Sequence, residues 1–170
     1  MAIANTFTQI GSTVTVGNAG SASITFTSIP ATYTDLVILA STRSNRSEVN
    51  DGFFVYLNGN TANITAKRLY GNSSSGSQDG GSSILNDADT ATASIFSNSR
   101  IYIPNYALAE NHSWSGETVT ENNSATNAFV SLVSAIWAST TIVTSITLTN
   151  ETGTGFMQYS TASLYGILKY

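Results

Sequence analysis

The chain has 170 residues, of which only 9% are charged, with 6 Lys and Arg against 10 Asp and Glu. So few basic residues argue against a nucleic-acid partner. The absence of cysteine excludes disulfides and thiolate metal sites, and the presence of a single histidine, His112, excludes sites with several imidazoles. With 41% apolar residues but no apolar run of about 18, we expect one folded domain without a membrane span.

Residues 1–20 are predicted to form a polar N-terminal segment, either an arm or an edge strand, followed by a single β-sandwich domain over residues 21–170. The start of the chain lacks a Lys/Arg-rich stretch followed by a continuous apolar stretch. No secretory signal peptide is therefore expected.

Apolar and polar residues alternate along most of the chain, between clusters of Gly, Asn and Ser, which is the pattern of β-strands. Residues 36–39 are continuously apolar, which predicts a central strand covered on both faces. The Asn58-Gly59 pair predicts a tight turn, after which the next strand would return antiparallel to the preceding one. The predicted strands span residues 13–16, 22–27, 33–42, 52–57, 63–70, 90–96, 99–103, 113–120, 129–136, 141–149 and 163–168.

Two stretches are harder to interpret. Residues 129–136 fit both helical spacing and the alternation Val130, Leu132, Ser134, Ile136, but Ser and β-branched neighbours favour a strand. Residues 71–83 consist entirely of Gly, Ser, Asn, Gln and Asp, which predicts a surface loop, either mobile or ordered by a partner. The whole pattern predicts an all-β fold: an antiparallel β-sandwich, jelly-roll-like or Greek-key in its connections, with long polar loops.

Catalytic chemistry is hard to assemble from this chain. Glu110 and Glu117 could form a glycosidase pair, but carboxylates in predicted turns are usually solvated. Residues 86–89 (Asn-Asp-Ala-Asp) resemble half of a calcium loop, yet a turn capped by its own side chains explains them equally well. Glu110-Asn111-His112 could begin a metal site, but no second histidine completes it. We expect no enzyme, no cofactor and no metal.

Binding is the remaining function. Tyr and Trp side chains could form a platform for sugars or partners, and Trp114, in the polar stretch His-Ser-Trp-Ser-Gly, is the best candidate for exposure. Trp137 is expected in the core. Arg43 and Arg46 lie near Glu48 and Asp51, which predicts a salt-bridge cluster at a strand end or a protomer interface. The candidate interface or ligand contacts are Arg43, Arg46, Tyr70 and Trp114.

Four stretches resemble a family of small virion structural proteins of tailed bacteriophages. They are the block Ile24 to Leu36 with its Ser-Ile-Pro-Ala-Thr-Tyr-Thr core; Arg43, Arg46 and Asp51 with the turn at 57–59 and residues 68–71; Ala135-Ile136-Trp137 with residues 143–148; and Phe156 with residues 160–167. The stretch 107–123 does not match. The resemblance covers nearly the whole chain in order and spacing.

The resemblance implies a jelly-roll-type capsid cement or decoration protein on the virion surface, made in the host cytoplasm. It implies a homo-oligomer, with a trimer as one form, that binds the major capsid protein. The alternative is a receptor- or glycan-binding module of a tail fibre or spike, contacting a tail component. A carbohydrate-binding or hydrolase accessory domain is a third, lower-ranked interpretation.

Overall fold

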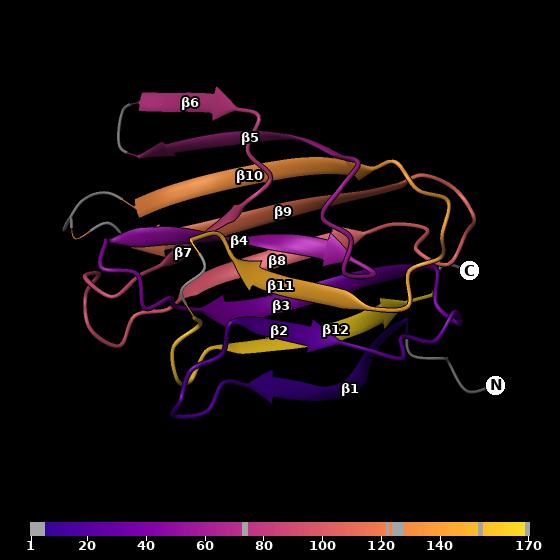
Figure 1. The fold of residues 1–170 in the computed structure, drawn as a ribbon, viewed down its shortest axis with the longest axis horizontal. Helices are drawn as coiled ribbons and strands as arrows, with labels where there is room; N and C mark the ends of the chain where they lie inside the picture. Colours follow the sequence, from indigo (N-terminus) through magenta and orange to yellow (C-terminus); the bar gives the residue numbers. More distant parts are fainter. Residues whose placement is uncertain (1–5, 73–74, 122, 124–127, 153–154, 169–170) are drawn as a thin grey trace.

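The protein consists of two antiparallel β-sheets packed face to face (Figure 1). The computed structural model describes residues 6–72, 75–121, 123, 128–152 and 155–168, and these residues contain no helix, which confirms the predicted all-β sandwich. None of them forms a helix long and apolar enough to cross a membrane. The strands are β1 (Phe7–Thr15), β2 (Ser23–Phe26), β3 (Asp35–Thr42), β4 (Asn50–Leu57), β5 (Ile64–Asn72), β6 (Ser75–Asp79), β7 (Ile84–Asp87), β8 (Ser97–Ile103), β9 (His112–Glu121), β10 (Ala128–Trp137), β11 (Ile146–Asn150) and β12 (Thr161–Ile167).

Eight strands form the larger sheet, in the order β1-β12-β3-β8-β9-β10-β5-β6, and four form the smaller sheet, in the order β2-β11-β4-β7. In Figure 1 the smaller sheet lies in front of the middle of the larger sheet, and β5 and β6 extend past it. The predicted N-terminal segment contains β1, which lies at the edge of the larger sheet and pairs with β12; residues 1–5 of the segment lie outside the described residues.

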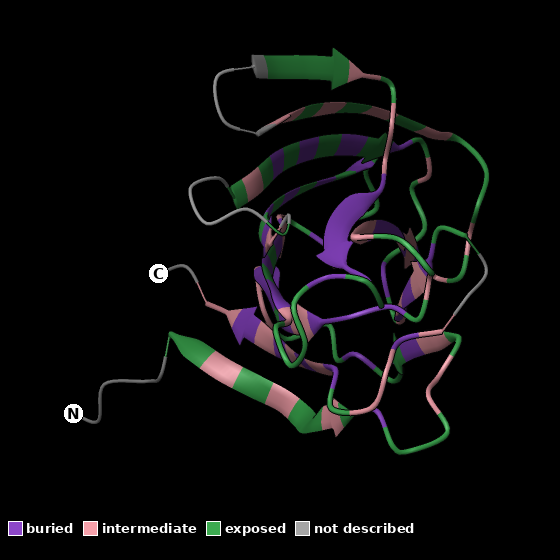
Figure 2. Ribbon diagram, turned by 90° about the vertical axis from the view of Figure 1, so that its left-hand side faces the viewer, coloured by how far each residue is buried: buried purple, intermediate pink, exposed green. Residues whose placement is uncertain are grey.

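The core lies between the two sheets. Ile38 and Ile101 of the larger sheet and Phe53 and Leu148 of the smaller sheet are fully buried in it. Successive side chains of a strand point to opposite faces, so β9 alternates between buried and exposed residues, and such bands are visible along the strands in Figure 2. The other set of side chains on the larger sheet therefore faces away from the core.

The predicted run of strands is largely confirmed, including the ambiguous segment 129–136, which lies in β10. The expected hairpin around Asn58-Gly59 is wrong. The turn itself exists, with positive φ at both residues and a hydrogen bond from the Asn60 N–H to the Leu57 carbonyl. However, β4 pairs with β11 and β7 in the smaller sheet, whereas β5 pairs with β10 and β6 in the larger one. The turn therefore carries the chain from one sheet to the other.

The predicted strand at residues 90–96 is wrong, and β7 just before it was not predicted. Residues 90–96 form turns and bends because their carbonyl groups point at the buried Arg43 guanidinium instead of a neighbouring strand. Strand β7 is only four residues long and ends in Asn86-Asp87, a pair typical of turns. Its backbone is nevertheless paired with β4.

Residues 141–145, the first half of the predicted strand 141–149, are not part of the ladder. The Asn58 side chain takes the place of a neighbouring strand there. Its Oδ1 accepts hydrogen bonds from the N–H groups of Thr144 and Ser145 at 2.8 and 3.1 Å, and its Nδ2 donates to the Ile142 carbonyl at 2.8 Å. Strand β11 starts only after this contact.

Candidate interaction surface

The outer face of the larger sheet carries a cluster of exposed apolar side chains, which we call the apolar patch. It contains six of the eleven large apolar residues that are exposed in the described part of the chain. Leu132, at its centre, is 55% exposed. Large exposed apolar clusters on soluble proteins mark surfaces that bind something. The patch consists of Leu39, Leu69, Val119, Val130, Leu132 and Ile136.

Strand register brings these side chains together. Leu132 of β10 lies directly opposite Leu69 of β5, and Val130 lies opposite Val119 of β9. Directly opposed side chains on one face have β-carbons about 5 Å apart, so each pair forms a continuous apolar contact. The patch joins residues that are up to 97 positions apart in sequence, from Leu39 to Ile136. It therefore exists only in the folded protein.

One ion pair lies in the middle of the patch. Arg100 of β8 is opposite Glu117 of β9, with Nη1 and Oε1 3.7 Å apart and the side chains 59% and 58% exposed. Leu39 flanks Arg100 on β3, and Leu132 flanks Glu117 on β10. An ion pair this exposed contributes little to folding stability. Its position makes it a candidate for recognition instead.

A hollow opens beside the ion pair, where small residues of neighbouring strands leave space between longer side chains. Ser115 of β9 and Ser134 of β10 are opposite each other and form its floor. Tyr102 borders it on β8 and donates a hydrogen bond to the Asp35 carboxylate at 2.7 Å. The surface around the patch is therefore not flat, and side chains of a partner can enter this hollow.

Sequence reasoning did not identify this patch. Residues 36–39 were expected to be covered on both faces, and Val37 is indeed buried, lying opposite Tyr102 and Tyr165 on its two neighbouring strands. Leu39 is exposed. The available signal was β10, in which the inward and outward sets of side chains are both apolar. A strand with two apolar faces is either covered twice or presents one face to a partner.

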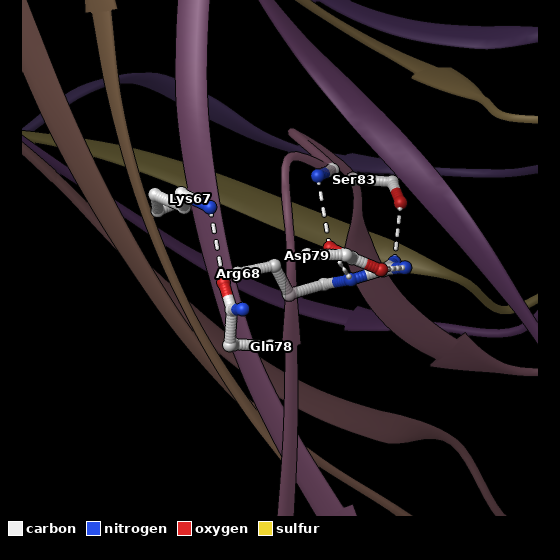
Figure 3. Close-up of polar contacts among 6 residues, drawn as sticks. Lys67, Arg68, Gln78, Asp79 and Ser83 are labelled. Atoms are coloured by element: carbon white, nitrogen blue, oxygen red, sulfur yellow. Dashed lines mark hydrogen bonds and ion pairs between the residues drawn. The ribbon is translucent and has the colours of Figure 1, made fainter.

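The predicted loop at residues 71–83 contains an edge strand, β6, which pairs with β5; residues 73 and 74 of that stretch lie outside the described residues. The polar sequence of β6 forms a ladder because backbone groups make the hydrogen bonds, and side chains then hold the edge (Figure 3). Lys67 donates to Gln78 at 3.0 Å. Arg68 contacts the Asp79 carboxylate at 2.7 Å and Ser83 Oγ at 2.8 Å.

Tyr70, one of the candidate contacts, belongs to this part of the sheet. Its ring stacks on that of Phe129 of β10 at a centroid distance of 6.0 Å, and the Arg68 guanidinium lies 5.0 Å from its centroid. It is half-buried on the inner side of the sheet, opposite Ser131. Tyr70 therefore holds β5 against β10 and is not part of the apolar patch.

Trp114 is not exposed, so the expectation of an aromatic platform there is wrong. The side chain is 2% exposed and lies in the core. Its strand alternates, so the neighbouring serines face outward while Trp114 points between the sheets. Trp137 is buried, as predicted, and stacks on His112 at 5.6 Å.

The expected salt-bridge cluster is confirmed for one of its two arginines. Arg46 lies 3.6 Å from the Asp51 carboxylate. Arg43 is only 5% exposed, and its guanidinium binds backbone carbonyl groups instead of a carboxylate. Its guanidinium donates four hydrogen bonds of 2.7 to 3.1 Å to the carbonyl groups of Asp89, Ala91, Thr92 and Ile95.

The half calcium loop at residues 86–89 is not formed. Its first two residues end β7, and the Asp87 carboxylate accepts the Glu121 N–H at 2.8 Å instead of capping its own turn. Burial, together with the nearby Glu121 carboxylate, raises the pKa of Asp87 to about 6, although the Glu121 N–H and the Arg43 guanidinium oppose the rise. No group of three or more His, Asp and Glu that could hold a metal occurs in the described part of the chain.

The structure does not assemble the two other candidate sites. Glu110 precedes β9, whereas Glu117 lies in its middle and pairs with Arg100. The six residues from His112 to Glu117 form an extended strand that rises about 16 Å, which carries Glu117 away from the start of β9, the end that Glu110 precedes. His112 is buried, and its Nε2 contacts the Thr141 carbonyl at 2.9 Å, so it does not open a surface metal site.

The fold and the patch together define an all-β sandwich with one exposed apolar face. Comparison of this chain with known protein families, curated proteins and solved structures gives no match.

Proposed function

We propose that the chain is a non-enzymatic structural protein of a bacteriophage virion, a capsid cement or decoration protein that binds the shell and bridges capsomers. The apolar patch is the observation that carries this proposal, because six large apolar side chains on one sheet face favour coverage by protein. The sequence blocks that resemble the phage family support a virion as the setting.

The strand connectivity supports assigning the sandwich to the jelly rolls, which are double sheets of eight strands found in viral capsids. Eight of the strands form two facing groups of four, β1-β12-β3-β8 and β2-β11-β4-β7. Along the chain, each of these eight strands lies in the opposite group from the one before it, with a single exception. The exception is β7, which lies in the same group as β4. The strand pairs β5–β6 and β9–β10 extend the larger sheet on one side of this unit.

The proposed mechanism is association. Copies of the chain meet through the apolar patch, and loops at the ends of the sandwich contact the major capsid protein on the outside of the shell. Few of the residues are charged, and 25 Ser and 24 Thr supply hydrogen-bonding groups. Contacts of this kind depend less on salt than ion pairs do.

A cryo-EM map of the particle tests the proposal directly. We expect density for this fold on the outer capsid surface, at the junctions between capsomers. Particles assembled with Leu132→Glu should carry less of the protein than particles with Leu108→Glu, an equally apolar and exposed control outside the patch. A particle that carries the protein only on its tail, or not at all, contradicts the cement assignment.

The glycan-binding tail module is the weaker alternative. Its main support was an exposed Trp114, and that side chain lies in the core. Its second support was a long polar loop at residues 71–83, part of which forms β6. No other observation on the described residues favours a sugar site, so we propose only the cement function.

A further inference from the structure

We infer that two copies of this chain stack face to face through the apolar patch, around a twofold axis that runs parallel to the strands between β8 and β9. The inference rests on the proposed function in one respect, the use of this face for self-association, and it names the partner and the geometry. A twofold interface must be complementary to itself, because the same surface appears on both sides.

The strand order of the larger sheet meets this requirement. The boundary between β8 and β9 is its centre, with four strands on each side. Rotation about an axis along this boundary, in the plane between the two copies, places β8 on the partner's β9, β3 on the partner's β10 and β12 on the partner's β5. The two sheets then overlap along their whole width, with the strand directions nearly aligned, as in packed sheets generally.

The central row of side chains is complementary under this rotation. Register places Leu39, Arg100, Glu117, Leu132 and Leu69 at one level across five neighbouring strands. After rotation, Arg100 faces the partner's Glu117, and Glu117 faces the partner's Arg100. Leu39 faces the partner's Leu132 on each side of these charges, so the two ion pairs are enclosed by apolar contacts.

A twofold axis perpendicular to the strands would place Arg100 near its own copy in the partner, which opposes association. Charge therefore selects the axis along the strands. The level next to the central row adds no repulsion, because Tyr102 of β8 faces the partner's Ser115 of β9. Lys67 of β5 shares that level and faces the partner's Tyr165 of β12, which is uncharged.

The face is large enough for a stable pair. At the usual strand spacing and rise, the six strands from β12 to β5 over seven residues cover about 29 by 23 Å, or roughly 650 Å² on each copy. Specific interfaces bury about 800 Å² on each partner. Side-chain relief and the outer strands increase the area beyond the flat value.

Analytical ultracentrifugation of the full chain, with single charge reversals, tests the pairing. The unmodified protein should sediment at twice its mass of 17.9 kDa. Arg100→Glu alone, or Glu117→Arg alone, creates like charges across the axis, so each should weaken association about tenfold or more. Glu110→Arg reverses an exposed acid outside the face and should pair like the unmodified protein.

The decisive measurement mixes the two single variants. In a mixed pair, the glutamates at positions 100 and 117 of one copy face the arginines at 117 and 100 of the other, so association should return. Within each chain the pair 100/117 still carries like charges, which means that recovery cannot come from the intrachain contact. Circular dichroism melting of each variant establishes that it is folded before it is mixed.

A folded mixture that stays monomeric, single variants that pair normally, or an unmodified monomer or trimer would each overturn the twofold geometry. Failure of the proposed function has a different signature. A dimer that responds to the charge reversals as described but does not occur on the capsid retains the pairing and removes the cement assignment. A protein that is found on the capsid, but whose association is unchanged by the charge reversals, retains the cement assignment and removes the twofold pairing.

Discussion

Ile84 of β7 packs its Cδ1 atom into the space above Gly116 of β9, 2.5 Å from where a β-carbon at position 116 would lie. This contact joins the two sheets at the centre of the sandwich, since both residues are buried. The short strand β7 can approach the larger sheet this closely only because position 116 has no side chain.

Gly116→Ala should therefore lower the free energy of unfolding by about 2 kcal/mol, because the added methyl group forces β7 away from β9. Ile84→Val removes the Cδ1 atom and by itself costs about 1 kcal/mol. In the double variant the two losses should be less than additive, as urea denaturation will show. Strictly additive losses would mean that the contact is not the source of the cost.

Arg43 holds the irregular segment 89–95 in place through hydrogen bonds to its carbonyl groups. Arg43→Lys retains the charge but cannot reach four carbonyl groups with one planar fork, so we expect a loss of about 3 kcal/mol in the free energy of unfolding. Arg46→Lys, which keeps the positive charge at a partly exposed ion pair outside the apolar patch, should change it by less than about 1 kcal/mol. Differential scanning calorimetry compares the two variants, and equal melting temperatures would contradict the role of Arg43.

The strands were predictable from sequence because their signal is local. Alternation together with Ser and β-branched residues identified β10 even though helical spacing was also present. The pairing of strands was not predictable, because it depends on distant partners. Asn58-Gly59 identifies a turn, but whether β5 then joins β4 or β10 is decided by surfaces elsewhere in the chain.

The candidate site was less predictable than the fold. Trp114 has polar neighbours in the sequence, which suggested that it is exposed. In a strand, however, adjacent residues point to the opposite face, so polar neighbours do not indicate that Trp114 itself is exposed. Arg43 had no sequence signal for its carbonyl contacts, because those depend on how residues 89–95 curve around it. The apolar patch is exposed only because nothing in this chain covers the outer face of the larger sheet among the described residues.

The buried Asp87 should give the protein an unusual pH dependence. Its pKa is about 6 in the folded protein and about 3.8 in the unfolded chain, so the folded state binds an extra proton between these values. The free energy of unfolding should therefore fall as the pH rises from 4 to 6, by up to about 3 kcal/mol, and then level off.

Asp87→Asn should abolish this fall and stabilise the protein at pH 7, since an amide at this position can still accept the Glu121 N–H without a buried charge. Asp79→Asn is the matched control. The hydrogen bond from Arg68 lowers the pKa of Asp79, so its contribution is lost only at more acidic pH and the fall between pH 4 and 6 should persist. Urea denaturation across pH decides, and an unchanged profile in Asp87→Asn would assign the effect to another group.

Two threonines on the inner face of β9 should respond in opposite directions to the same substitution. Thr118 Oγ1 contacts the carbonyl groups of Leu85 and Asn98 at 3.0 and 3.1 Å and the Ser99 hydroxyl at 3.0 Å. Thr120 is buried as well, and its Oγ1 has no hydrogen-bond partner among the described residues.

Thr118→Val should therefore lower the free energy of unfolding by about 1 to 2 kcal/mol, because it leaves a buried carbonyl group without its donor and the Ser99 hydroxyl without its acceptor. Thr120→Val exchanges an unpartnered hydroxyl for a methyl group of similar size and should raise the free energy of unfolding by up to about 1 kcal/mol. Because the two positions share a strand and a face, differences in β-propensity cancel between them. Chemical denaturation measures both, and a loss at Thr120 as large as that at Thr118 would show that its hydroxyl is also satisfied in the folded protein.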